Sequence, residues 1–390
     1  MNLTLRGWLC LILGVGWTVL ALLIGEHDLV WPGLFLALLP VLSLLWLLPG
    51  LNARVQRTIT DQLVPAGVPT SWTVDLAVSG FNPGAVGELT EQLPPAFGGN
   101  WYFSYVLGPN SQRFTVSATP RWRGRHLIGP ATWRLTQALG LARVTREVRS
   151  AATLVVTPRV HLLEPVRGVS AGRSGIQTPT PRSGSQGSDD ALVREYRSGD
   201  DFRRIHWPSS ARTGELMVRR EEHAWDPDAV LLLDARTASY TSPVNDQRLE
   251  AVISLAASIG CHLLQENWSL TLVEPGNELH SWPGSGSDRS RALLLHLTDV
   301  TLNPATDLPR LGTSGELLIA LLGRLTKADA LELIAARRDQ RHCWALVMEG
   351  HPDTDPQAVA TLRESGWSAH LVSPRTPPAS AWQLFAEVGR

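Results

Sequence analysis

Side chains that could take part in chemistry are concentrated between residues 192 and 223, where arginines and carboxylates are interleaved. The arginines are Arg194, Arg197, Arg203, Arg204, Arg212, Arg219 and Arg220. The carboxylates are Glu195, Asp200, Asp201, Glu215, Glu221 and Glu222. Because a guanidinium binds a carboxylate through two parallel hydrogen bonds, this near balance of signs favours internal ion pairs. The alternative is a phosphate or partner site built from Arg203, Arg204 and Arg212.

His206 and Trp207 lie in the middle of the same stretch. His206 could act as a general base, but no serine, cysteine or acid is placed to complete a recognisable triad with it. A hydrolase that uses His206 with Asp200 or Asp201 remains the enzymatic alternative. Either aspartate could cap a short helix over residues 202–205. The large side chain of Trp207 is expected to be buried.

From Asp226 onward the hydrophobic pattern alternates between strands and helices. The expected strands cover residues 229–233, 268–273, 316–322, 342–348 and 367–372. The expected helices cover residues 248–264, 289–297, 328–337, 356–365 and 381–388. Repeating strand–helix units predict an α/β doubly wound parallel sheet, in which ligands bind at the carboxyl ends of the strands.

Two uncharged stretches, residues 8–24 and 29–48, open the chain and are separated by a short polar loop. A bilayer core of about 30 Å needs roughly 20 helical residues, so residues 1–50 are expected to form a two-span transmembrane helical hairpin. The positive residues that flank the spans are Arg6, Arg54 and Arg57, whereas the loop between them has none. This asymmetry predicts a two-pass protein of the cell membrane with both termini in the cytoplasm.

Residues 51–165 have a different pattern, in which polar and apolar side chains alternate. The clearest runs are residues 57–60, 71–78, 112–118 and 131–135. Period-two alternation punctuated by Gly and Pro predicts an all-β, antiparallel sandwich. Residues 166–190 are rich in Gly, Ser, Thr, Pro and Arg, which predicts a flexible linker.

The segment after that linker closely resembles the signature of the domain of unknown function 58 family. The matching residues run from Arg194-Glu195-Tyr196-Arg197-x-Gly199-Asp200-Asp201-x-Arg203-Arg204-Ile205-His206-Trp207 through Ser210-Ala211-Arg212-Thr213-Gly214-Glu215-Leu216 to Val218-Arg219. A second similar segment is Arg123-Gly124-Arg125-His126-x-x-Gly129-Pro130. The family often continues there with Asp-Pro-Phe-Gly-Leu, and this chain departs from that pattern with Gln137-Ala138-Leu139-Gly140-Leu141.

The resemblance implies that residues 226–390 form a von Willebrand factor A-like domain and that residues 191–225 dock on it. Such domains often hold magnesium through Asp-x-Ser-x-Ser, because hard cations bind clustered oxygens. This chain keeps only Asp234 of that motif and has Arg236 and Ala238 at the serine positions. We therefore expect a degenerate metal site at Asp234, with no metal and no cofactor. Asp234 is expected to pair with Arg236 or to cap the following turn.

Composition and resemblance together favour a binding protein over an enzyme. The chain has 35 Lys+Arg against 36 Asp+Glu and three scattered cysteines, so a nucleic-acid binder and a disulfide framework are disfavoured. The resemblance implies a membrane-anchored adaptor that docks a MoxR-type AAA+ ATPase, with a transglutaminase-like membrane protein as a further partner. The candidate partner-binding residues are Tyr196, Arg197, Gly199, Asp200, Arg203, Arg204, His206, Trp207 and Arg212. An outward-facing, metal-dependent adhesion module is the third alternative.

Overall fold

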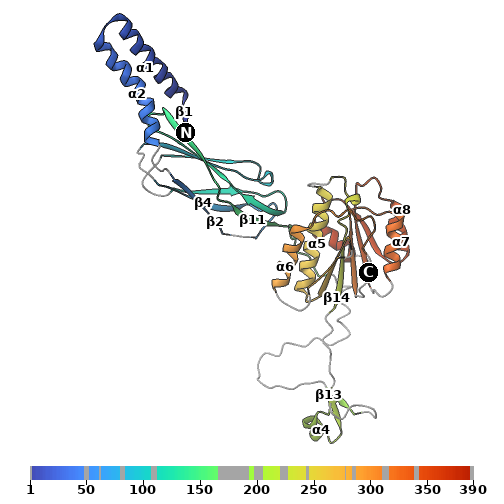
Figure 1. The fold of residues 1–390 in the computed structure, drawn as a ribbon. Coiled ribbons are helices and arrows are strands. Elements are labelled where there is room, and N and C mark those ends of the chain that lie inside the picture. The colour runs from blue at the N-terminus through green and yellow to red at the C-terminus, as the bar shows by residue number, and fades with distance from the viewer. Residues whose placement is uncertain are drawn as a thin grey trace. The chain divides into compact units, whose positions relative to one another are not determined.

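The chain folds into two compact units, shown in Figure 1. The computed structural model describes residues 2–47, 52–60, 63–79, 84–106, 112–165, 193–196, 205–219, 227–242, 246–276, 278–282, 287–309, 316–337 and 342–386. One unit is Met1–Val160 with Leu294–Thr301, and the other is His161–Leu293 with Leu302–Arg390. The expected linker at 166–190 lies outside the described residues. The expected docking of residues 191–225 on the α/β domain stays a prediction.

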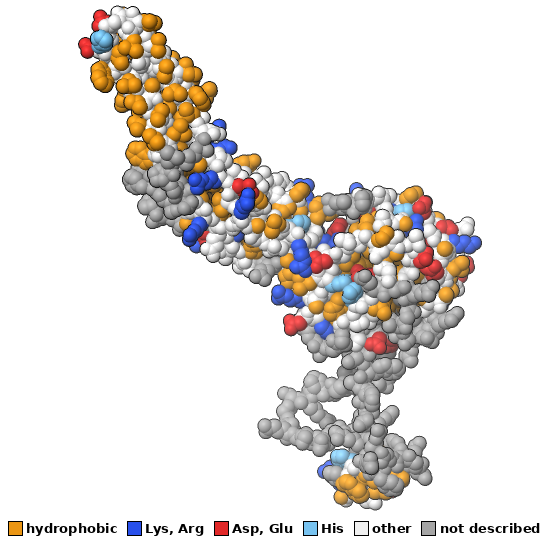
Figure 2. All heavy atoms as spheres, in the orientation of Figure 1, with side chains coloured by type: hydrophobic (Ala, Val, Ile, Leu, Met, Phe, Trp, Pro, Cys, Tyr) orange, Lys and Arg blue, Asp and Glu red, His pale blue; other side chains and the backbone are white. Residues whose placement is uncertain are grey.

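The first unit begins with a hairpin of two helices, α1 (Leu5–Ile24) and α2 (Val30–Leu47), joined through a 3₁₀ turn at His27–Leu29. Both helices are long and apolar enough to cross a membrane, with mean hydropathies of 2.3 and 2.1. Their large side chains point outward, and Figure 2 shows hydrophobic atoms covering the hairpin. By length and composition the hairpin therefore fits the expected pair of spans.

Small residues let the two helices approach each other closely. The buried residues of α1 are Gly7, Gly14 and Ala21, which are spaced by seven. A Cβ built on Gly14 would lie 2.4 Å from the backbone nitrogen of Ala37, and one on Gly33 would lie 2.5 Å from Oγ1 of Thr18. In lipid, helices associate through such close backbone packing because there is no hydrophobic driving force between them.

Changing Gly14 to leucine is therefore expected to separate α1 from α2. Gly16 is the matched control, because a Cβ there meets nothing within 4 Å. Spin labels at the exposed Leu13 and Leu38 should lose their dipolar broadening in Gly14→Leu and keep it in Gly16→Leu. Equal broadening in both variants would show that the hairpin does not depend on this contact.

Three sheets complete the first unit. The largest has the order β1-β10-β9-β5-β6, and two three-stranded sheets have the orders β2-β4-β7 and β3-β11-β8. The strands are β1 (Asn2–Leu3), β2 (Asn52–Ile59), β3 (Leu63–Pro65), β4 (Thr70–Ser79), β5 (Val86–Glu91), β6 (Trp101–Val106), β7 (Gln112–Ala118), β8 (Gly124–Ile128), β9 (Ala131–Thr136), β10 (Ala142–Val148) and β11 (Ala152–Thr157). One buried core joins them, with Trp72 and Trp133 among its largest members. The pairing of β3 with β11 is parallel, so the expectation of a purely antiparallel sandwich was wrong in that detail.

The turn that departs from the family pattern, residues 137–141, holds the start of α1. Thr4 donates its backbone N–H to the carbonyl of Leu141 at 2.9 Å and its hydroxyl to that of Gly140 at 2.6 Å. The Thr4 side chain also caps α1 by accepting from the N–H of Gly7. Strand β1 pairs with β10, so the hairpin is attached to the largest sheet by backbone hydrogen bonds.

The second unit is built on a six-stranded sheet with the order β16-β15-β14-β17-β18-β19. Its strands are β14 (Asp228–Leu233), β15 (Ser269–Glu274), β16 (Glu278–Trp282), β17 (Leu317–Leu322), β18 (His342–Met348) and β19 (Ser368–Val372). Its helices are α5 (Gln247–Gln265), α6 (Ser287–Asp299), α7 (Lys327–Ala336), α8 (Pro356–Glu364) and α9 (Pro378–Ala386). Helices α7 and α8 cover one face of the sheet, and α5 and α6 cover the other (Figure 1).

The expected strands and helices of this unit are all present, with one addition. Strand β16 runs antiparallel to β15 at the edge of an otherwise parallel sheet, so the sheet is mixed. The near-continuous apolar runs of β14 and β17 are fully buried, as central strands of such a sheet require. Cys261 and Cys343 are buried free thiols.

Candidate functional site

The signature segment forms a small antiparallel ladder with a helix beside it. Strand β12 (Val193–Glu195) pairs with β13 (Met217–Arg219), and Ile205 adds a bridge to Val218. Helix α4 (Trp207–Thr213) follows that bridge. The hydroxyl of Ser210 ties helix to ladder, because it accepts from the N–H of Met217 at 2.8 Å.

Two expectations about this segment were wrong. Ile205, the last residue of the helix expected over 202–205, lies in a bridge to the ladder, and the described helix begins at Trp207. Residues 202–204 lie outside the described residues. Pro208 explains the start, since proline fixes a helical φ at the first positions of a helix. Trp207, which was expected to be buried, is 67% exposed at the start of α4.

The structure describes only part of the predicted binding set. Tyr196 is half-buried and donates its N–H to the carbonyl of Leu216, whereas Arg212 is exposed near the end of α4. The other members lie outside the described residues: Arg197, Gly199, Asp200, Arg203 and Arg204. Asp201, the other acid of the hydrolase alternative, also lies there. Their role in binding stays a prediction.

His206 is the N-cap of α4. Its Nδ1 lies 3.3 Å from the backbone nitrogen of Ser209, which donates to it, and 2.8 Å from Oγ of the same serine. A nitrogen that already accepts one of the free N–H groups in the first turn of a helix is occupied by a structural hydrogen bond. This geometry favours a positioning role for His206 over that of a general base.

A second group of functional side chains lies where the strand order of the α/β sheet reverses. Strands β14 and β17 are neighbours, and the chain leaves them toward opposite edges of the sheet. The carboxyl ends of such a pair form the usual ligand-binding crevice of a doubly wound sheet. Asp234 directly follows β14 and is fully buried. One of its oxygens accepts the N–H of Gly323, the residue after β17, at 3.3 Å.

Arg236 fills this crevice with an internal cation. Its Nε donates to Oδ1 of Asp234 at 2.8 Å and its Nη2 to Oδ2 at 3.2 Å, a two-point pair. Its Nη1 donates to Oδ1 of Asp329 at 2.7 Å and to the carbonyl of Thr306 at 3.1 Å. The backbone N–H of Arg236 also donates to Asp234. Both expected roles of Asp234, pairing with Arg236 and capping the turn, are therefore present.

The environment keeps Arg236 and Asp329 charged. Burial alone would lower the pKa of Arg236, but hydrogen bonds and charges of Asp234 and Asp329 outweigh it and raise that pKa. Burial alone would raise the pKa of Asp329, but hydrogen bonds from Arg236 and Thr326 hold it below the ordinary value. A carboxyl group whose pKa is lower in the folded than in the unfolded protein stabilises the fold at a pH above the unfolded-state pKa. This stabilisation is lost as the pH falls toward the folded-state pKa.

The crevice does not fit the magnesium that a von Willebrand factor A-like fold would imply. A divalent cation needs free oxygens, and the guanidinium of Arg236 occupies both oxygens of Asp234. That no metal binds there stays a prediction, and no chemical step is derived through such an ion. The crevice can serve to bind a partner or to stabilise the fold, and its positive charge comes from Arg236.

Sequence reasoning missed two neighbours of Arg236. Asp329 is the third residue of α7 and forms a capping box with Thr326, so the Thr-x-x-Asp spacing was the signal that could have located it. Tyr240 donates its hydroxyl to the carbonyl of Asp234. Burial, together with the charge of Asp234, raises the pKa of Tyr240, so its phenol stays protonated as a donor.

Comparisons with known proteins find similarity over part of the chain. Residues 192–334 match the family model described as "Protein of unknown function DUF58". The uncharacterized protein YeaD of Bacillus subtilis (strain 168) is 26% identical over 189 residues, which cover 48% of this chain and 46% of that protein. The chain thus spans less than half the length of this relative.

Similar solved structures are only distant. The CARDB domain of the PF1109 protein from Pyrococcus furiosus, in complex with di-metal ions, is 15% identical, with 27% of this chain and 91% of that one covered and a TM-score of 0.20. The alkylpurine DNA glycosylase AlkC from Pseudomonas fluorescens is 16% identical. The match covers 36% of this chain and 42% of that one, with a TM-score of 0.17. Scores this low support no statement about the fold or function of this chain.

Proposed function

Residues 192–334 match the family model described as protein of unknown function DUF58, and from that match we propose that this chain is a membrane-anchored adaptor. In this proposal it docks a MoxR-type AAA+ ATPase, in a chaperone-like assembly or a process of the cell envelope, with a transglutaminase-like membrane protein as a further partner. In the same proposal the α/β unit acts as a von Willebrand factor A-like domain, and the presence of Arg236 in its switch-point crevice supports a role that needs no metal.

The observation that carries the proposal is the exposure of Trp207 on α4. Trp207 is 67% exposed and Leu216 41% exposed, and the exposed Arg212 lies on the same short helix as Trp207. Tryptophan and arginine are the residues most enriched among those that dominate binding energy at protein interfaces. An exposed tryptophan is costly to keep in water, so a partner that covers it would account for its position.

The way the hairpin connects to the first unit supports a position of the β-rich part on one side of the membrane. Strand β1 precedes α1 and pairs with β10, and the last residue of α2, Leu47, belongs to the same β core. Both ends of the hairpin therefore meet one folded unit, which must lie on one side of the membrane. We propose the cytoplasmic side, where Arg6 and Arg54 flank the spans and an ATPase has access to ATP.

The test is photo-crosslinking in cells with the full chain. A photoreactive amino acid at Trp207 is expected to capture an AAA+ ATPase subunit, identified by mass spectrometry. Capture by the same amino acid at Ala211 should fall by about tenfold or more when Trp207 is changed to alanine, because a central aromatic anchor is worth about 2 kcal/mol or more. Leu331→Ala, which removes an exposed apolar side chain of α7, is the matched control and should leave capture unchanged.

Two outcomes would count against the adaptor. Capture of the ATPase at an undiminished level in Trp207→Ala would remove α4 from the interface. A reporter fused after Arg390 that signals export would place the unit outside the cell, where a cytosolic ATPase cannot reach it.

A further inference from the structure

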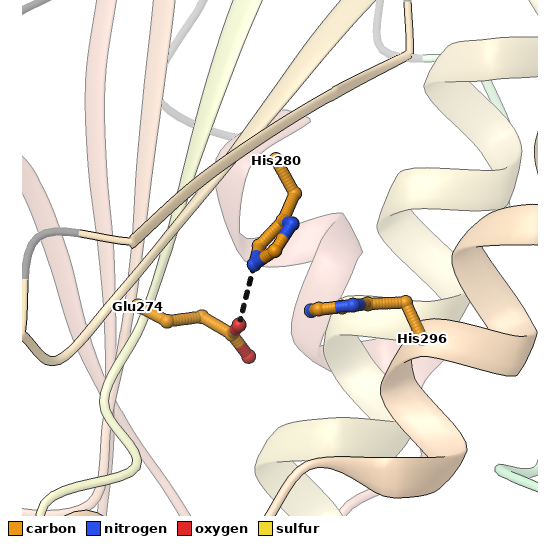
Figure 3. Close-up of side chains that lie close together, drawn as sticks. All are labelled: Glu274, His280 and His296. Atoms are coloured by element: carbon orange, nitrogen blue, oxygen red, sulfur yellow. Dashed lines mark ion pairs between the residues drawn. The ribbon is translucent and has the colours of Figure 1, made fainter.

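Three potential metal ligands meet at the edge of the α/β sheet, away from the residues already discussed. Figure 3 shows the side chains of Glu274, His280 and His296 pointing toward one another. One donor atom from each lies within 4.8 Å of the others, and Nε2 of His280 lies 3.6 Å from Oε2 of Glu274. Glu274 is buried, and both histidines are half-buried.

The fold brings the first two residues together by register. In the β15–β16 ladder Leu272 faces His280, and Glu274 faces Glu278. Residues two apart on a strand share a face, so Glu274 and His280 are diagonal neighbours on one side of the sheet. The antiparallel edge strand β16 is thus what supplies the first histidine.

His296 comes from α6, which packs on the same sheet. Leu293 is fully buried, and a Cβ on Gly260 of α5 would lie 2.5 Å from its Cδ2, so the two helices are in close contact there. His296 follows one turn later on the same unbroken helix, and residues three apart share a helix face. Helix α6 is unbroken from Ser287 to Asp299, and the donor atom of His296 lies within 4.8 Å of those of Glu274 and His280.

We propose that Glu274, His280 and His296 bind one transition-metal ion, with zinc as the best fit. Two imidazoles and one carboxylate are a ligand set that zinc takes in proteins, and they leave a fourth position open for water or a further ligand. Tetrahedral bonds of about 2.0–2.1 Å place donors roughly 3.3–3.5 Å apart, close to the 3.6 Å between His280 and Glu274. Oxygen-preferring magnesium and calcium do not match a site with two imidazoles.

This site is separate from the magnesium position of the fold and does not depend on the proposed adaptor role. The Asp234 crevice contains an arginine, whereas the ligands proposed here lie on β15, β16 and α6. A metal there would join the edge strand β16 to the helix above it.

Titration of the full chain with zinc, after purification in detergent and removal of metal by a chelator, tests this site. Calorimetry is expected to show one zinc per chain, and cobalt added alone should give the visible absorption bands of a tetrahedral ion. His280→Ala and His296→Ala should each weaken zinc binding by about 100-fold, the share of one ligand in a structural site. His342→Ala, another half-buried histidine of the unit, is the matched control and should bind as the unchanged chain does.

The result that overturns the site is the absence of saturable zinc binding, or equal binding by His296→Ala and His342→Ala. If His280→Ala does not fold, His296→Gln replaces it, because a half-exposed helix position tolerates glutamine. In that case zinc should raise the melting temperature of the unchanged chain and not that of His296→Gln. An equal rise in both would assign the effect to other residues.

Discussion

Changing Arg236 to alanine is expected to lower the unfolding free energy of the α/β unit by about 3–5 kcal/mol, the usual cost of removing one partner from a buried ion pair. The side chain is fully buried and donates to two carboxylates and a carbonyl. Its loss leaves Asp234 and Asp329 buried without their cation. A domain of ordinary stability has only about 5–15 kcal/mol in total, so this change approaches unfolding.

The cysteines of the α/β unit offer a readout that the other unit does not disturb. Cys261 and Cys343 are buried there, and burial raises the pKa of the Cys343 thiol to about 11, so it reacts slowly while folded. In a chain that carries Cys10→Ser, pulsed alkylation during denaturation reports the unfolding of this unit. Arg324→Ala is the control, because its pair with Asp353 is partly exposed and is worth less than about 1 kcal/mol.

The same variant tests whether Arg236 stands in for a cation. Once the guanidinium is gone, Asp234, Asp329 and the carbonyl of Thr306 leave their oxygens around the space that it occupied. Magnesium or calcium should then restore part of the lost stability of Arg236→Ala and leave the unchanged chain as it is. If neither ion has an effect on the variant, the arginine is a structural residue without a connection to metal binding.

The sequence predicted those contacts of the crevice whose two residues are close together in the chain. The pairing of Asp234 with Arg236 was predicted because the two residues are two apart and follow a strand end. Asp329 was missed because its partner lies 93 positions away, and only the strand order brings α7 to the end of β14. Periodicity identifies elements, but it does not show which of them become neighbours.

The same limit explains the edge of the sheet and the signature segment. Strand β16 is only five residues long, and its weak Glu-Leu-His-Ser-Trp alternation was not recognised, so His280 had no assigned place. Trp207 was expected in the core because tryptophan is large and apolar. In the structure it is 67% exposed at the start of α4, which residue type alone does not reveal.

Changing Glu91 to alanine is expected to destabilise the β-rich unit by a similar amount, about 3–5 kcal/mol. Glu91 and Arg57 are both almost fully buried, and Nη2 of Arg57 lies 3.0 Å from Oε2 of Glu91. Nη1 of Arg57 also donates to the carbonyl of Ser150 at 2.6 Å. Arg57 was one of three residues used to predict orientation, and its burial means that it acts through the fold of this unit.

A double variant separates the cost of a broken pair from the value of the intact pair. Arg57→Met with Glu91→Leu removes both charges, so it should lose clearly less stability than Glu91→Ala, even though the carbonyl of Ser150 loses its donor. A cysteine at the buried Val116 gives a thiol readout for this unit, and Arg134→Ala, from an exposed pair with Glu88, is the control.

The stability of this sheet also affects the hairpin, because β1, which precedes α1, pairs with β10 in the sheet that contains Glu91. If the double variant is as unstable as Glu91→Ala, the buried pair contributes net stability of its own. If it is nearly as stable as the unchanged chain, the pair instead specifies one packing of the sheets. In both cases, unfolding of this unit would release the hairpin from the pairing of β1 with β10.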